Sequence, residues 1–240
     1  AQNTHVQIII FDLILLNMEK IFSFIIILLC SHLADAQIIS LTKDGKSAYT
    51  IIIPQKPTNI EVQAAKVFQD YIHRISEVTI PLADDQQKQS SHEVWIGKVN
   101  RKDVANINYN ELGADGILIK TIGRNLCITG GDRKGVLYAV YTFLEDHLGC
   151  RKYTSTLTYI PKQKNIRLNA LNDIQLPAFA YRETFYNDVF DPEFMDWHKL
   201  HSFEGRGGDK SQWGYWVHTF HNLRMPERRQ KFFPGLRYFL

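Results

Sequence analysis

Residues 128–153, ITGGDRKGVLYAVYTFLEDHLGCRKY, constrain the fold more than any other stretch of this sequence. Apolar residues recur there at helical spacing, and charged residues mark the opposite face and both ends. Gly130 and Gly131 form a turn before the helix, and Gly149 stands where a helix end favours a positive φ. The stretch therefore predicts a strand, a tight glycine turn and one amphipathic helix packed on a sheet.

Residues 38–170 predict short strands that alternate with two helices. A β-branched run at 49–53 ends at Pro54, and Thr58 with Glu61 has the spacing of a capping box for the next helix. We expect a closing edge strand at 165–168 and further strands at 94–96, 116–121 and 126–129, the last two forming a hairpin. The order β-α-β-β-β-α-β indicates an α/β (α+β) fold, a mixed sheet with two principal helices.

The N-terminal residues have the composition of an export signal. Met18 is followed by Lys20, an apolar run at 21–30, and the small residues Ala34 and Ala36. The run is shorter than the roughly 20 apolar residues that span a bilayer. We therefore predict a signal peptide at 18–36, upstream sequence at 1–17, a secreted or periplasmic protein, and no stable membrane span after cleavage. A lipoprotein anchored through Cys30 is the alternative.

Charge and cysteine content exclude some classes of protein. The 28 basic and 25 acidic residues give a net charge of only +3, which argues against a nucleic-acid partner. Cys127 and Cys150 remain after the signal. They are either a disulfide, in an oxidising compartment, or two buried thiols.

Two motifs resemble binding sites for a phosphate or a metal. TGGDRKG, residues 129–135, lies at a helix start but lacks both Walker and GxGxxG spacing, so we interpret it as a tight turn and expect no cofactor. The pairs His198/His201 and His218/His221, with Asp196 or Glu204, have a spacing that zinc sites use. Without an HExxH motif, substrate contact or a structural role are the other interpretations, and no metal site is assigned.

The late segment gathers carboxylates and aromatic rings. Residues 171–177 suggest a linker, residues 178–185 a strand, and residues 192–203 a helix with Pro192 in its first turn. Arg182 and Glu183 lie near the end of that strand, and glycoside hydrolysis uses paired carboxylates. The aromatic residues would be either a platform for a sugar ring or part of a core; they are Trp213, Tyr215 and Trp216.

Three stretches carry a family resemblance. ITGGDRKGVLYAVYTFLEDHLGCRKY, AAKVFQDYIHRISEVTIPL and DGILIKTIGRNLCITGG resemble the N-terminal domain of bacterial α-glucuronidases, a type related to domain two of β-hexosaminidases. The resemblance covers residues 38–170. In enzymes of this kind the domain precedes a catalytic barrel.

The following segment resembles a second group. PAFAYRETFYNDVFDPEFMDWHKLHSF and WGYWVHTFHNL are similar to a secreted family of uncharacterised proteins that joins such a domain to a TIM-like barrel. The resemblance implies that residues 177–240 hold the first elements of an incomplete barrel. It implies substrate contact near the barrel rim by five residues, Arg182, Glu183, Trp216, His218 and His221.

These observations predict an accessory N-terminal domain of a secreted, α-glucuronidase-like glycoside hydrolase, with a polysaccharide or oligosaccharide as partner. No catalytic residue is assigned, because the resemblance puts the catalytic acid beyond the barrel elements present. We therefore expect the chain to be inactive as it stands, and the codons of Leu236–Phe239 suggest a frameshift. A non-catalytic glycan-binding protein and a zinc hydrolase built on the histidine pairs are the alternatives.

Overall fold

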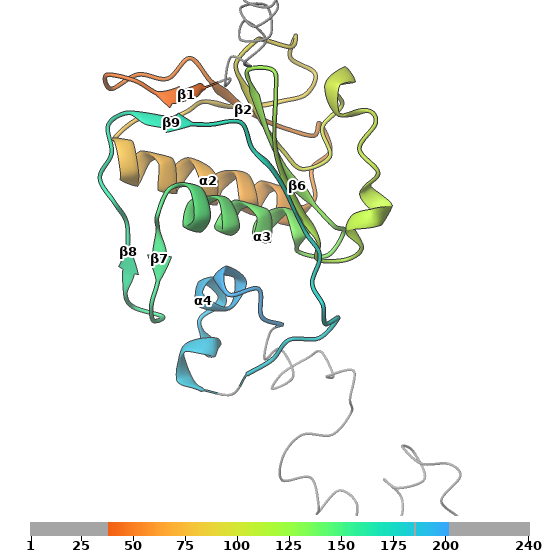
Figure 1. Cartoon of the computed structure of the whole chain (residues 1–240), viewed down its shortest axis with the longest axis vertical. Coiled ribbons are helices and arrows are strands. Elements are labelled where there is room, and N and C mark those ends of the chain that lie inside the picture. Colours follow the sequence, from red (N-terminus) through yellow and green to blue (C-terminus); the bar gives the residue numbers. More distant parts are fainter. Residues whose placement is uncertain (1–37, 185, 202–240) are drawn as a thin grey trace, which may run out of the picture.

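The computed structural model describes residues 38–184 and 186–201, which build a mixed sheet with two main helices on one face (Figure 1). The sheet has six strands in the order β10-β5-β6-β4-β2-β3. Parallel pairing joins β3, β2, β4 and β6, whereas β5 is antiparallel to both β6 and β10. The predicted mixed sheet with two principal helices is confirmed. Its strands are β2 (Thr50–Ile53), β3 (Leu82–Asp84), β4 (Glu93–Ile96), β5 (Ile117–Ile122), β6 (Asn125–Gly130) and β10 (Asn172–Gln175).

Both faces of the sheet are covered, so its central strands are apolar at nearly every position. Ile51 and Ile128 pack on the helix side, in the larger core. Trp95 and Cys127 point to the other side, where Val104 covers them. That cover belongs to the connection that carries two short 3-10 helices, η1 (Lys102–Val104) and η2 (Tyr109–Leu112).

The helix α2 (Asn59–Ser76) begins with the predicted capping box. Thr58 Oγ1 accepts a hydrogen bond from the Glu61 backbone N–H at 3.2 Å, and Glu61 Oε2 accepts from the Thr58 N–H at 2.8 Å. Glu61 Oε1 also accepts from the Lys98 backbone N–H at 2.9 Å, which ties the start of the helix to the end of β4. Phe68 and Ile72 are fully buried against the sheet and the second helix.

The second helix, α3 (Gly135–Thr142), runs on into a π-helical turn, η3 (Phe143–His147). It lies beside α2 (Figure 1), where the Phe68 and Phe143 rings are 5.6 Å apart. At the π turn, Glu145 accepts a hydrogen bond from Trp197, and His147 Nε2 lies 2.6 Å from Asp173 Oδ2. The turn therefore sends side chains to two later segments. Gly149 has the predicted positive φ, +73°.

Two short ribbons lie outside the main sheet. β1 (Ile39–Thr42) pairs with β9 (Ile166–Leu168), and β7 (Arg151–Lys152) pairs with β8 (Thr158–Tyr159). The predicted strand at 165–168 therefore exists, but it does not close the main sheet. The edge is instead β10, inside the stretch predicted as a linker. β10 is mostly exposed and shows no apolar alternation, so only its backbone pairing with β5 makes it a strand.

The strand predicted at 178–185 is wrong, whereas the helix predicted from Pro192 is present but shorter. Residues 178–184 form no strand, and Phe179 is 72% exposed. The short 3-10 helix η4 (Asn187–Phe190) follows, and α4 (Pro192–Trp197) ends well before residue 203. Lys199 has a φ of +56°, a left-handed conformation that stops the helix. No barrel is evident in the described residues.

Two further expectations concern the cysteines and the membrane. Cys127 and Cys150 are free, buried thiols in cores on opposite sides of the sheet, and burial raises their pKa values to about 12 and about 11. No helix of the described part has both the length and the apolar content to cross a bilayer. The predicted signal peptide at 18–36 and the stretch at 1–17 lie outside the described residues.

Candidate functional site

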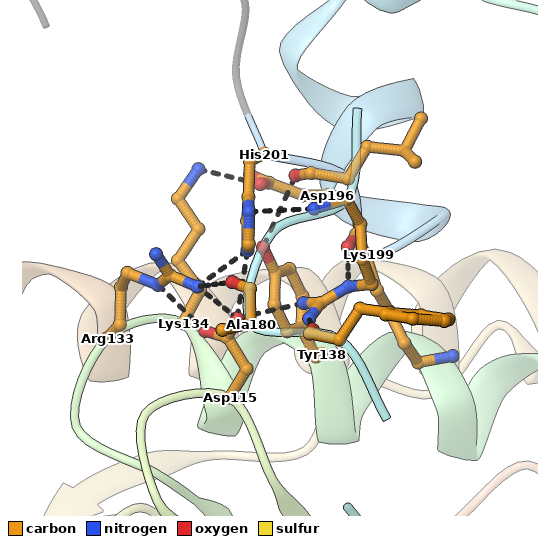
Figure 2. A network of polar contacts seen from close by, with 11 residues as sticks. Asp115, Arg133, Lys134, Tyr138, Ala180, Asp196, Lys199 and His201 are labelled. Atoms are coloured by element: carbon orange, nitrogen blue, oxygen red, sulfur yellow. Dashed lines mark hydrogen bonds and ion pairs between the residues drawn. The ribbon is translucent and has the colours of Figure 1, made fainter. Parts of the chain in front are cut away.

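A buried carboxylate lies where residues 38–176 meet residues 177–201, a contact that we call the seam. Asp115, just before β5, has a side chain only 2% exposed. Its Oδ1 accepts from Arg133 Nε at 3.0 Å, and its Oδ2 accepts from Arg133 Nη2 and, at 2.8 Å, from Arg182 Nη2. Figure 2 shows this carboxylate between Arg133 and His201. Asp115 therefore joins cations from both sides of the seam.

His201 completes the coordination of Asp115. Its Nδ1 accepts the Arg182 backbone N–H at 3.1 Å, so the ring proton belongs on Nε2, which lies 3.0 Å from Asp115 Oδ2. The His201 backbone N–H donates to the Arg182 carbonyl at 2.7 Å. Burial and the Arg133 and Arg182 charges lower the pKa of His201, against the opposing pull of Asp115. A neutral ring with its proton on Nε2 satisfies these two hydrogen bonds. Arg133 Nη2 lies 2.5 Å from the same Nε2, and both nitrogens converge as donors on Asp115 Oδ2.

Arg182 is held by several groups at once. Its Nε donates to the Lys199 carbonyl and its Nη1 to the Phe179 carbonyl, each at 2.8 Å. These bonds close a loop between the two ends of residues 179–199. The bond to Asp115 fixes this loop on residues 38–176, which we call the first domain. Because a planar guanidinium offers five N–H donors, one arginine can satisfy carbonyls and a carboxylate together.

The helix α4 is fastened by three side chains. Glu193 accepts from Tyr71 Oη at 2.7 Å and from Lys152 Nζ at 2.8 Å. Asp196 accepts from Lys134 Nζ at 2.7 Å, as Figure 2 shows. Trp197 is buried among aromatic residues of α2 and α3, and its Nε1 donates to Glu145 Oε2 at 2.9 Å. The helix is thus held on the first domain by charge, hydrogen bonds and one large ring.

The glycine turn is explained by close packing. A Cβ on Gly131 would overlap the Gly113 carbonyl oxygen, and one on Gly130 would overlap Gly135. Neither Gly130 nor Gly131 is among the glycines with a positive φ, so close approach of the backbone, not an unusual φ, requires them. Of the charged residues that follow, Arg133 pairs with Asp115 and Lys134 with Asp196. The interpretation of TGGDRKG as a tight turn is therefore confirmed.

The carboxyl groups with a clear pKa shift are held in the ionised state. Burial would raise the pKa of Asp115, but hydrogen bonds from Arg133, His201 and Arg182 outweigh it and hold that pKa well below its usual range. Burial would likewise raise the pKa of Glu193, but hydrogen bonds from Lys152 and Tyr71 outweigh burial and lower that pKa. Such groups suit ion pairing, whereas a general acid needs a raised pKa.

The structure describes two of the five residues predicted to contact substrate. Arg182 lies in the seam, with the partners given above, and Glu183 is the next residue along the same irregular segment. Trp216, His218 and His221 lie outside the described residues, so the structure does not bring the five together. Substrate contact by these residues stays a prediction.

The histidines of the first pair point to different partners. His198 Nε2 donates to the Lys152 carbonyl at 3.1 Å, whereas His201 is bound to Asp115. Within residues 38–184 and 186–201, no group of three or more His, Cys, Asp and Glu side chains is arranged to hold a metal ion. Zinc binding that involves the second pair, His218/His221, stays a prediction, because that pair lies beyond the described part.

Asp115 was missed by sequence reasoning, and so was the pairing of Arg133 with it. The one local signal is the run Gly113-Ala114-Asp115-Gly116, an acid set between glycines before a strand. A Cβ on Gly116 would overlap the Leu112 carbonyl oxygen, so the turn is tight. Nothing in the run indicates that its acid meets residues 67 and 86 positions further along the chain.

Comparison with known families separates the chain into two regions. Residues 37–143 match the family described as Glycosyl hydrolase family 67 N-terminus. They form a domain of that family. Residues 152–239 match a second family, described as a domain of unknown function, DUF4838. The second match begins in β7, so it includes β8, β9, β10, η4 and α4. No curated protein matches the chain significantly.

Solved structures of carbohydrate-active enzymes match the chain over part of its length. The GH20 exo-β-N-acetylglucosaminidase of Vibrio harveyi is 18% identical over 61% of this chain and 19% of that one, with a TM-score of 0.37. The N-acetyl-β-hexosaminidase of Streptomyces plicatus is 15% identical over 61% of this chain and 26% of that one, with a TM-score of 0.39. The 4-O-methyl-α-glucuronidase BtGH115A is 14% identical over 60% of this chain and 19% of that one, with a TM-score of 0.40. The chain thus spans at most about a quarter of these structures.

Proposed function

We propose that this chain provides the accessory N-terminal domain of a secreted glycoside hydrolase that acts on polysaccharide, α-glucuronidase-like in type. Residues 38–176 position the region that begins at residue 177, and the chemistry belongs to that later region. The observation that carries this proposal is the match of residues 37–143 to the N-terminus of glycosyl hydrolase family 67. Within this proposal the export signal at 18–36 directs the protein out of the cytoplasm.

The state of the carboxyl groups supports an accessory role. Glycoside hydrolysis needs one carboxyl with a raised pKa and a second that is ionised. In the described residues, the carboxyl groups with a clear shift all have lowered pKa values; they are Glu93, Asp115, Asp188 and Glu193. Glu93 is typical, because burial opposes the shift but hydrogen bonds from Arg101 and Trp95 outweigh it. These groups stabilise the fold through ion pairs and hydrogen bonds.

An assay of the purified chain tests the proposal. It would be incubated with uronic-acid-bearing xylan oligosaccharides and with neutral oligosaccharides, and released sugar would be measured. We expect no release above that of a heat-unfolded control. Release by the folded chain that survives Asp115→Asn and is lost in a variant of another carboxylate would place the chemistry inside the chain and contradict the accessory role.

A binding measurement on the same panel separates the alternatives. Titration calorimetry that detects saturable binding without release would favour a non-catalytic glycan-binding protein. Zinc found at one equivalent in protein purified without a His tag would favour a hydrolase built on the histidine pairs. Absence of binding, release and zinc agrees with a purely positioning role.

A further inference from the structure

The segment after residue 177 has little core of its own. Its apolar cluster consists of Val189, Phe194 and Met195, with Leu200 packed against them. Trp197, its largest buried side chain, belongs instead to the core of the first domain, 5.6 Å from the Tyr71 ring and 5.0 Å from the Tyr141 ring. A segment this short cannot bury enough apolar area to hold one conformation by itself. Its shape therefore depends on the surface it contacts.

That surface offers charges that match the segment. Lys134 and Lys152 on the first domain receive Asp196 and Glu193, while Asp115 receives Arg182 and His201. The charges are complementary at each of these ion pairs, and a segment displaced enough to bring Arg182 to Lys134 or Lys152 would place like charges together. With the segment in place, Lys152 and Asp115 are almost fully buried, 4% and 2% exposed, so a substitution that removes only the partner side chain leaves a desolvated charge.

Asp115 holds both ends of the segment. Arg182 lies near its beginning and His201 at the end of the described residues, and both contact the same Oδ2 atom. Arg133 binds this carboxylate from the first domain and keeps it ionised and oriented. The two ends are also joined through their backbones, by the bond from His201 N–H to the Arg182 carbonyl. One carboxylate therefore sets where the segment enters and where it leaves.

We propose that Asp115 is a positioning residue that fixes segment 177–201, which lies inside the second family region, on the accessory domain. His201, the last described residue, then has a defined position on the accessory domain. This inference deepens the proposed function and rests on it, because it names the device by which the accessory domain acts. The partner that the surface fits is the chain's own segment 177–201, recognised by complementary charges around one buried acid.

Limited proteolysis of the full chain tests this, because trypsin cleaves after Arg182 and Lys199. Cleavage rates at these bonds, mapped by mass spectrometry, would be compared with those after Lys66 on α2 and Lys120 on β5. In Asp115→Ala we expect cleavage at the two seam bonds to rise at least about tenfold, since Arg182 and Arg133 lose a buried partner. Asp115→Asn keeps one carbonyl oxygen and should give an intermediate rise.

The matched control is Asp132→Ala. Asp132 pairs with Lys98 in an exposed ion pair that includes no residue bound to Asp115, and its side chain is 81% exposed. This variant should leave all four cleavage rates unchanged, because exposed pairs contribute little to stability.

Two results would overturn the inference. Unchanged seam cleavage in Asp115→Ala would mean that Asp115 does not hold the segment. A parallel rise after Lys66 and Lys120 would mean that it stabilises the whole domain without positioning the segment. If Asp115→Ala does not fold, Arg182→Met decides, because it changes only the segment side; it should raise cleavage after Lys199 selectively. The glycan assay is independent of these rates, so failure of either proposal can be told from failure of the other.

Discussion

The two regions of the described molecule, residues 38–176 and residues 177–201, are held by different forces. In the sheet with α2 and α3, apolar side chains such as Phe68 and Ile128 are fully buried, and their removal from water stabilises the fold. Residues 177–201 bury few apolar side chains and rely on ion pairs around Asp115, Lys134 and Lys152. Apolar burial is non-directional, whereas paired charges depend on geometry. Apolar burial therefore stabilises residues 38–176, whereas ion pairs set the position of residues 177–201.

Truncation of the apolar core should have the largest effect. Phe68→Ala removes a fully buried ring that contacts Phe143, and we expect a loss of about 3–5 kcal/mol in the free energy of unfolding. Segment 177–201 should be released in the same transition, because its contacts lie on this core. Urea denaturation followed by circular dichroism measures the loss. Phe179→Ala is the matched control, since its ring is 72% exposed, and an equal loss there would refute the comparison.

Acid should loosen the seam before it unfolds the sheet. The pKa of His201 is lowered from its usual 6.5 by burial and by two arginines, so the unfolded state binds more protons below that pH. The stabilisation from neutral His201 is thus full above about pH 6.5 and is lost as the pH falls through the lowered folded value. The Asp115 contribution is lost at still lower pH, because hydrogen bonds hold its pKa below its usual range despite burial.

Amide hydrogen exchange between pH 8 and pH 5 measures this, after correction for the intrinsic exchange rate. Residues 179–201 should lose protection as the pH falls, while α2 keeps its own. In His201→Gln the change between pH 7 and pH 5 should largely disappear. A change of the same size in that variant would show that another group titrates.

Sequence reasoning succeeded where local signals and burial agree. The capping box at Thr58, the hairpin around Gly123 and the helix after Gly135 depend on neighbouring residues, and each was predicted. It failed for β10 and for residues 178–184. There the conformation is set by long-range partners: β5 for Asn172–Gln175, and Asp115 for Arg182. A charged side chain on an irregular segment carries no periodic signal that could point to such a partner.

The same reasoning recovered the family and only part of the candidate site. Arg182 was singled out as a substrate contact, and the structure places it in an ion pair that sequence spacing could not indicate. The acid that organises the seam, Asp115, was not considered. Ion pairs between residues far apart in the sequence form only when the chain folds and brings them together. In the sequence, such residues therefore look like ordinary surface charges.

Loss of the helix cap should lower the free energy of unfolding by a smaller amount, and the effect should be confined to residues 38–176. Thr58→Ala removes the acceptor of the Glu61 N–H and should lower the free energy of unfolding by about 1 kcal/mol. Thr58→Ser keeps the hydroxyl and should be close to wild type. Thermal denaturation compares them, and equal midpoints for both variants would mean that the cap adds nothing in this fold.

The smallest expected effect concerns a pair on the helix surface. Asp70 and Arg74 form an exposed i,i+4 pair at 3.4 Å, and Asp70→Asn should change stability by about 0.5 kcal/mol or less. Comparing the stability loss of this variant with that of Asp115→Ala shows how much more a buried charge contributes than an exposed one. A loss above about 1 kcal/mol in urea denaturation would contradict it.

The central claim is that residues 177–201 belong to the fold of the accessory domain. Amide hydrogen exchange of the full chain at pH 7 tests it directly, by comparing peptides from α4 and His201 with a peptide from α2. We predict measurable protection of the His201 and Trp197 amides, lost on Asp115→Ala while α2 stays protected. Exchange of residues 177–201 at the rate of an unfolded chain in the wild-type protein, with α2 protected, would contradict the account.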